Sequence, residues 1–279
     1  MRYLLTIFFV FNISAIHAQL DTAFYLAPIP EWSNQTQEIE ISTPFPNAIV
    51  TVFNSDSSYY NQVALSQGVP NTIYLNTTAQ GLQSTYGAIS TQLGNQVLDR
   101  AALFVRSDRD IVLTQRVTQQ YNQDLLSAKG TRALGKLFLA GNQTKIVNAP
   151  PAGEAALGFI SFVAIENNTS VSVNLPPGIT DKNGDNIISC VLNKWQSYTV
   201  TLDEDEQFAG ASIISSKPIS VTTGANHVKQ NAGGPEQDGG MDQLVPQDLV
   251  GNEYVIARGL APASLDYLVI IPTDDNTNI

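Results

Sequence analysis

The chain is poor in the residues on which disulfide frameworks, zinc sites and much acid–base catalysis depend. Its 279 residues include one cysteine, Cys190, and two histidines. A single cysteine excludes an internal disulfide, and a zinc site built from cysteine and histidine is excluded by the count of each. Cys190 lies in an apolar run and is predicted to be a buried strand residue. No cofactor is predicted.

Charge is also scarce, and it is unbalanced. Only 14% of the residues are charged, and 25 acidic against 14 basic residues give a formal net charge of -11. No basic stripe exists to displace counterions, so nucleic acid is excluded as a partner and anionic membrane surfaces are disfavoured. A hydrophobic content of 43% is typical of a folded protein rather than a disordered one.

Long hydrophobic runs are missing except at the N-terminus. Residues 1–18 combine a short positive start at Arg2, an apolar stretch and the small residue Ala18 before Gln19. This is the pattern of a cleaved signal peptide, and the run is shorter than the about 20 residues that a membrane span needs. We therefore predict no membrane insertion of the mature chain and a secreted or cell-surface location. The lack of disulfides favours a bacterial source over an animal one.

Alternation of polar and apolar residues between turn clusters predicts β-strands along almost the whole chain. The clearest stretch holds seven strand candidates within about 110 residues, which is the size of an immunoglobulin-like sandwich. Propeller blades need about 40–45 residues each, so a propeller-like arrangement of the same repeats is the alternative. The candidates are Gly135–Ala140, Phe159–Ile165, Ser170–Leu175, Asn186–Leu192, Ser197–Leu202, Ala211–Ser215 and Pro218–Thr223.

The sequence repeats itself at a nearly constant spacing. Apolar tetrapeptides that begin at Phe24, Leu137 and Tyr254 look like three copies of one opening strand. Two further matches are each 108 residues apart, and agreement at one spacing is stronger evidence than either match alone. They join residues 107–111 to 215–219 and residues 166–171 to 274–279.

These spacings predict an all-β chain of tandem antiparallel units, each β-sandwich-like. The first unit covers residues 19–133 and carries a polar insertion near 80–96. The second covers residues 134–245 and ends in a Gly-rich loop. Residues 246–279 start a third, truncated unit. We therefore expect further domains of the same polypeptide beyond Ile279, and the chain is interpreted as a fragment of a longer protein.

Two stretches are predicted to lie outside the strands. Residues 123–129 are expected to include a helical turn. Gly224–Asp242 is the most loop-like segment, because its paired glycines break regular structure. Long loops in compact domains are usually functional or disordered, so this loop is the expected binding element. The candidate binding residues in and beside it are His227, Asp238, Asp242 and Gln243.

No catalytic constellation is evident, and we predict that the protein is not an enzyme. His227 has no G-x-S-x-G nucleophile elbow near it. Asp238 and Asp242 leave a carboxylate-dependent hydrolase as an alternative. Residues 181–186 carry oxygen side chains at alternate positions, as a calcium loop does, but they lack its sixth-position glycine and distal glutamate. The pair Asn183-Gly184 favours a hairpin turn instead, so no metal is predicted.

A family resemblance rests on the C-terminal quarter of the chain. Residues 241–246 read Met-Asp-Gln-Leu-Val-Pro and are followed by Gly251 and an aromatic-led strand at Tyr254. Lys217-Pro218 lies in a Ser-x-Lys-Pro-Ile strand, and residues 275–277 form an Asp-Asn-Thr turn. In this order the pieces resemble the IgGFc-binding protein N-terminal domain family. Pro246, Gly251, Tyr254, Lys217 and Pro218 would be structural motif residues, with Asp242 and Gln243 bracing the turn before Pro246.

The resemblance implies an extracellular β-rich module, of a kind found in an animal mucus glycoprotein and in exported proteins of Bacteroidetes-like bacteria. With the signal peptide, it predicts a non-catalytic adhesion or recognition module of a larger exported or cell-surface protein. The expected partner is an extracellular glycan or glycoprotein. A structural spacer or stalk without a ligand is the alternative. Immunoglobulin binding by this chain would rest on analogy alone.

Overall fold

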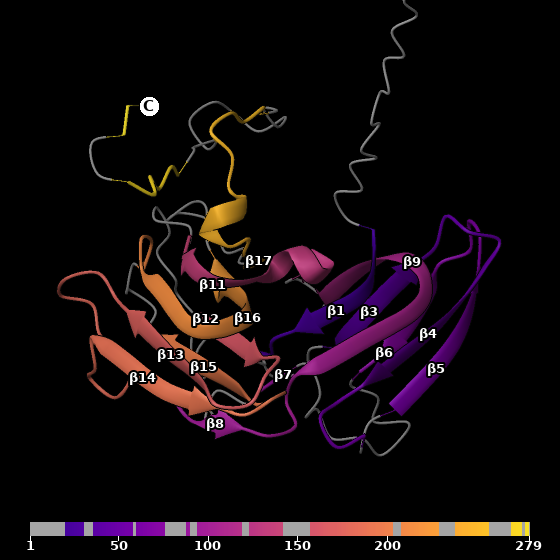
Figure 1. Ribbon diagram of the computed structural model, residues 1–279, viewed down its shortest axis with the longest axis horizontal. Coiled ribbons are helices and arrows are strands. Elements are labelled where there is room, and N and C mark those ends of the chain that lie inside the picture. The colour runs from indigo at the N-terminus through magenta and orange to yellow at the C-terminus, as the bar shows by residue number, and fades with distance from the viewer. Residues whose placement is uncertain are drawn as a thin grey trace, which may run out of the picture.

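Two antiparallel β units lie side by side in the computed structural model of the protein (Figure 1). Residues 1–18, the expected signal peptide, lie outside the described residues, as does most of the insertion at 80–96. The structure describes residues 20–30, 36–57, 60–75, 88–89, 94–118, 123–141, 157–202, 208–228, 238–256, 269–274 and 277–278.

Each unit is built from seven strands. Those of the first unit are β1 (Asp21–Leu26), β3 (Thr36–Ser42), β4 (Asn47–Phe53), β5 (Tyr60–Ser66), β6 (Asn71–Tyr74), β9 (Leu103–Thr118) and β10 (Gln123–Ser127). Those of the second are β11 (Leu134–Leu139), β12 (Gly158–Ala164), β13 (Thr169–Asn174), β14 (Ile187–Leu192), β15 (Ser197–Leu202), β16 (Ser212–Val228) and β17 (Asp238–Gln243). The remaining elements are β2 (Ile29–Pro30), β7 (Ala88–Ile89), β8 (Val97–Leu98) and the 3-10 helices η3 (Gly130–Ala133) and η4 (Gln247–Leu249).

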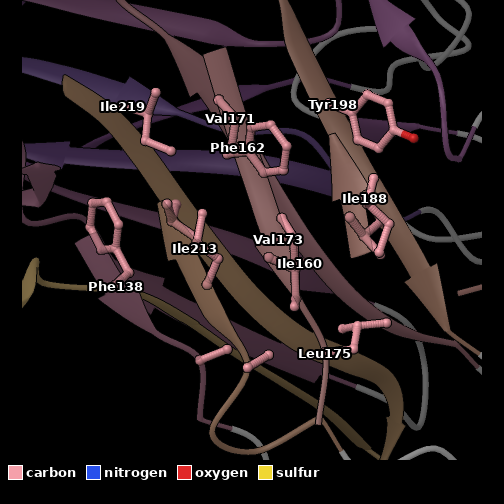
Figure 2. Packing of buried hydrophobic residues seen from close by; sticks show 14 of the residues in the cluster. Phe138, Ile160, Phe162, Val171, Val173, Leu175, Ile188, Tyr198, Ile213 and Ile219 are labelled. Carbon is pink, nitrogen blue, oxygen red and sulfur yellow. The ribbon is translucent and has the colours of Figure 1, made fainter. Parts of the chain in front are cut away.

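One long strand holds each unit together by taking part in two layers. The first half of β9 pairs with β1 and β4, and its second half pairs with β3 and β10. In the second unit β16 takes the same place, pairing first with β11 and β13 and then with β12 and β17. Inward-facing residues of all seven strands share one apolar core in the first unit. In the second, side chains such as Phe138, Ile160 and Val173 meet between the layers (Figure 2).

The pairing registers of the two units match, which confirms the predicted tandem all-β fold. The ladders β1–β9 and β11–β16 run in the same register and contain a register shift at the same point. The long strands are related by 108 residues, as predicted. The opening strands are related by 114 residues rather than 113, so Phe24 corresponds to Phe138 and not to Leu137. Both phenylalanines are fully buried in the core of their unit. The seven-stranded units are sandwich-like rather than four-stranded blades.

Two local predictions are wrong. Residues 123–127 form β10 and not a helical turn. The two strands predicted around Lys217-Pro218 are a single strand, β16. Pro218 lies between the part of β16 that pairs with β13 and the part that pairs with β12. Its missing N–H therefore costs no hydrogen bond in either ladder.

The Gly-rich stretch is also more regular than predicted. Gly224 to Val228 continue β16, and β17 begins at Asp238, so that residues 229–237 alone connect a hairpin. A Cβ on Gly224 would overlap the backbone of Gly240 and Met241 in the neighbouring strand. Glycine here permits close approach of two strands rather than breaking them, which sequence composition does not distinguish.

The two units pack through an apolar interface of their own. Trp195, in the turn between β14 and β15, packs against Phe53 and Phe104 of the first unit, with ring centroids 5.8 and 5.2 Å apart. The φ of Trp195 is 73°, a left-handed conformation that costs roughly 1–3 kcal/mol in a non-glycine residue and is offset here by this packing. The segment containing β8 pairs with β15 and covers that edge of the second unit.

Candidate functional site

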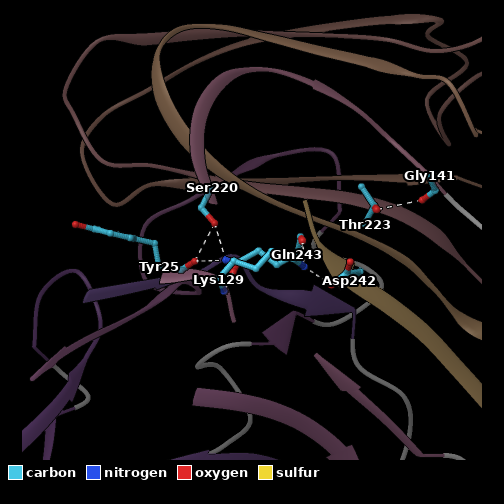
Figure 3. A network of polar contacts seen from close by, with 7 residues as sticks. All are labelled: Tyr25, Lys129, Gly141, Ser220, Thr223, Asp242 and Gln243. Atoms are coloured by element: carbon cyan, nitrogen blue, oxygen red, sulfur yellow. Dashed lines mark hydrogen bonds and ion pairs between the residues drawn. The ribbon is translucent and has the colours of Figure 1, made fainter. Parts of the chain in front are cut away.

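The predicted motif residues Asp242 and Gln243 lie where the second unit meets the first. They end β17, the return strand of the hairpin that β16 begins, opposite Thr223 and Thr222. From this position Gln243 points into the space between β16, β1 and the segment that joins the units (Figure 3). The motif is therefore part of an inter-unit contact.

The side-chain amide of Gln243 connects three segments that are far apart in the sequence. Its Nε2 donates to the carbonyl oxygen of Tyr25 in β1 and to Oγ of Ser220 in β16, each at 2.9 Å. Its Oε1 accepts the backbone N–H of Lys129 at 2.7 Å. Only 1% of the residue is exposed. Both polar atoms are bonded inside the protein, and the geometry gives Gln243 a bracing role.

Lys129 closes the network from the segment between the units. Its Nζ lies 2.5 Å from Oδ1 of Asp242 and also donates to the carbonyl oxygen of Gln243. Because Asp242 is exposed, this ion pair contributes at most about 1 kcal/mol. Sequence reasoning missed Lys129, Tyr25 and Ser220, because each contributes a contact that only the packing of the two units creates.

The remaining motif residues occupy different places in the fold. Pro246 is buried against Gly135 of β11, and the Tyr254 hydroxyl accepts the backbone N–H of Gly251 at 3.1 Å. The Nζ of Lys217 donates to the carbonyl oxygen of Asn167 at 2.5 Å. The side chains of His227 and Asp238 lie outside the described residues, so their roles stay predictions.

The β16–β17 hairpin runs beside the equivalent β9–β10 hairpin of the first unit. β10 and β17 are neighbours, and a Cβ on Gly239 would lie 2.9 Å from the Cβ of Asp124. Each of these residues is the second of its strand, directly after the connection of its hairpin. The two hairpins are therefore neighbours at the point where each return strand begins, at Asp124 and Gly239.

Comparison with protein families identifies the second half of the chain. A family model described as IgGFc binding protein matches residues 127–279, more than half of the chain. The chain belongs to the IgGFc binding protein family. The match begins at the last residue of β10, so it includes Lys129, the whole second unit and the C-terminal segment. No curated protein and no solved structure matches the chain.

The IgGFc binding protein family is one of binding domains rather than enzymes, and its domains are typically extracellular. Within the described part of this family member, no group of three or more His, Cys, Asp or Glu side chains could hold a metal ion. Asn183-Gly184 lies in a turn, in which the N–H of Gly184 donates to the carbonyl oxygen of Asp181 at 2.9 Å and the φ of Gly184 is +89°. The pair does not close a tight hairpin as predicted, because residues 175–186 connect β13 to β14. Among the described residues no helix has the length and hydrophobicity of a membrane span.

Two groups in the second unit have strongly raised pKa values. Burial raises the pKa of the Cys190 thiol to about 11. Burial, with smaller contributions from Cys190, Asp181 and Asp185, raises the pKa of the Tyr198 hydroxyl to about 12. Cys190 lies in strand β14, as predicted, but it is half-buried rather than buried, and it packs against the core. Its thiol is protonated at neutral pH, and such a cysteine is a poor nucleophile.

Proposed function

We propose that the protein is a non-catalytic extracellular recognition module that binds a glycoprotein or glycan through the connections of its neighbouring β9–β10 and β16–β17 hairpins. The observation that carries the proposal is the adjacency of the two hairpins at Asp124 and Gly239. The connection in the family-matched unit, residues 229–237, is more than twice as long as its counterpart at 119–122. A binding element that varies between repeats while its strands are kept is typical of recognition scaffolds.

The strand that leads out of the longer connection supports this function because hydrogen bonds hold it on both sides. Strand β17 is held by its ladder to β16 and by the Gln243 bonds to Tyr25, Ser220 and Lys129. A binding loop on fixed strands loses less conformational entropy on association than a free one. The connection contains two Gln, one Asn and two Gly, with one lysine, Lys229, and one glutamate, Glu236, a composition that suits hydrogen bonding to a polar, hydrated partner.

Three partners are to be compared: an immunoglobulin Fc, the same Fc without its glycans, and a mucin. The Fc is included because the family description names it, and the other two separate recognition of glycan from recognition of protein. The net charge of -11 disfavours nucleic acid. We further propose that the chain is secreted or displayed at the cell surface, as part of a polypeptide with further domains.

The test replaces residues 229–237 with Asn-Gly, a dipeptide that closes a tight hairpin. Binding of each partner is measured by surface plasmon resonance on the native and the shortened chain. We expect the shortened chain to lose at least about tenfold in affinity, or about 1.4 kcal/mol. The matched control changes another exposed turn of the same unit, Lys182→Ala with Asn183→Ala, and should bind as the native chain does. Equal binding by the shortened chain would place recognition elsewhere.

A structural spacer is the second candidate function, and the apolar packing of one unit on the next favours it. In that case neither the native nor the shortened chain binds any of the three partners. The discriminating measurement is therefore the native chain alone, before any variant is made.

A further inference from the structure

The two units differ in what covers one equivalent face. In the first unit the outward side chains of β1 and β9, with their flanking residues, are covered by the second unit. Ala23, Tyr25 and Phe104 are buried there in one apolar cluster, together with Ala27 and Ala102. The second unit contributes Val163 to this cluster, and Trp195 packs against it.

The matching registers identify the same face on the second unit. Leu137, Leu139 and Ser212 stand where Ala23, Tyr25 and Phe104 stand in the first. There the face is open: Leu137 is 38% exposed, whereas Ala23 is 6% exposed. Leu139 and Ser212 are half-buried, and so is Gly141, the counterpart of Ala27, while Gly210, the counterpart of Ala102, is exposed.

The C-terminal segment already touches this face at two equivalent points. Ile271 follows Val163 by the repeat spacing of 108 residues, and its Cδ1 lies 3.8 Å from the position of a Cβ on Gly141. In the first interface Val163 and Ala27 likewise share one apolar cluster. Likewise, η4 packs on β11 as η3 packs on β1.

We infer that the face formed by Leu137, Leu139, Gly141, Gly210 and Ser212 is the docking surface for a third β unit, one that residues 246–279 begin. The third unit would sit on the second as the second sits on the first, a head-to-tail arrangement in which each repeat contacts its neighbours. The five residues of this face carry no charge, which suits burial against another apolar surface. This inference concerns assembly and is independent of any ligand at the hairpin connections.

The arrangement is tested by cross-linking within the chain. In a Cys190→Ser background, Gly141→Cys is combined with Ile271→Cys, and the pair is treated with a short bismaleimide. Circular dichroism checks that each variant is folded. We expect intramolecular cross-linking in the monomer, and little in a control chain that combines Ile187→Cys with Ile271→Cys. Ile187 is 62% exposed on β14, outside the face.

A charged substitution then tests whether this apolar face binds the C-terminal segment that contains Ile271. Leu137→Lys should lower the cross-linking rate at least about tenfold, because docking would bury an unpaired charge. Ile187→Lys, the matched control, should leave the rate unchanged. Sedimentation velocity on the native chain should show a monomer.

Three results would overturn the inference. Absence of the intramolecular cross-link would mean that residues 269–274 do not dock at Gly141. Equal rates with Leu137→Lys would exclude the apolar face as the contact. A dimer that Leu137→Lys dissociates would make a second copy of the chain the occupant. None of these measurements uses a glycoprotein, so failure here and failure of the proposed recognition function are told apart.

Discussion

The two β units share one architecture, and they differ on the surfaces that face outward. Core positions keep their character, with Phe24 matched by Phe138. On the outer face Phe104 is matched by Ser212 and Arg106 by Ile214. The residue types at core positions are constrained by the fold of the unit itself, whereas those on the outer face depend on whether another unit covers it. The two units therefore keep similar residues at positions that form their cores and differ at positions that contact other units.

The largest expected effect comes from exchanging the residues at one equivalent position. Phe104→Ser should lower the free energy of unfolding by about 3–5 kcal/mol, because a buried aromatic contact with Trp195 is lost. Ser212 is half-buried and accepts a hydrogen bond from Nδ2 of Asn174, so Ser212→Phe should lower the free energy of unfolding by about 0.5–1.5 kcal/mol, less than Phe104→Ser. Urea denaturation followed by circular dichroism measures both. Similar losses in the two variants would mean that the two faces are equally buried.

A smaller effect is expected at the brace between the units. Gln243→Leu removes the donors to Tyr25 and Ser220 and leaves the N–H of Lys129 without its acceptor. Buried groups left unpaired in this way cost about 1–3 kcal/mol. The control, Gln62→Leu on the exposed face of β5, should stay within about 0.5 kcal/mol of the native chain. If the hydrogen bonds of Gln243 do not stabilise the fold, Gln243→Leu and Gln62→Leu will have the same free energy of unfolding.

The smallest effect is a pH dependence confined to the second unit. Cys190, whose pKa is raised from 9.0 to about 11, has Val63 as its counterpart in the first unit. The unfolded chain loses the thiol proton first, so this contribution to stability is complete below pH 9 and declines as the pH rises toward 11. The pKa of Tyr198 is raised from 10.0 to about 12, so its contribution to stability declines in the same way, about one pH unit higher.

Cys190→Val therefore tests this difference between the units. Urea midpoints at pH 8, 9 and 10 should fall less steeply for the variant than for the native chain, because the variant keeps only the tyrosine contribution. Near pH 8 the urea midpoints of the native chain and of Cys190→Val should change equally little with pH. Parallel decline from pH 9 upward would show that Cys190 is not desolvated in the folded state.

Much of the fold followed from local pattern. The strands β13 and β15 alternate polar and apolar residues, and their predicted bounds agree with the structure to within one residue. The 108-residue spacing of the long strands could be read because Ser107 and Ser215 stand in similar short motifs. The continuity of β16 through Pro218 and Gly224 could not be predicted from the sequence. A proline between two ladders and a glycine in close strand contact both look like the end of a strand.

The candidate site divides in the same way. Asp242 and Gln243 were found from a motif, but their partners Lys129 and Tyr25 are more than 100 residues away in sequence and follow from no periodicity. The adjacency of β10 and β17 likewise depends on how one unit sits on the other. Contacts between repeats involve outward residues, whose pattern in each strand is compatible with either solvent or a neighbour.

The sequence by itself determined that this protein is an all-β chain of repeated units in the IgGFc binding protein family, because alternation and repeat spacing are local properties of the chain. Only the tertiary structure decided that Gln243 braces the junction, that Ala23 is covered where its counterpart Leu137 is exposed, and that the two hairpins are neighbours. Those features arise from packing between segments far apart in the sequence, where burial and hydrogen bonding depend on position in space rather than on neighbours along the chain.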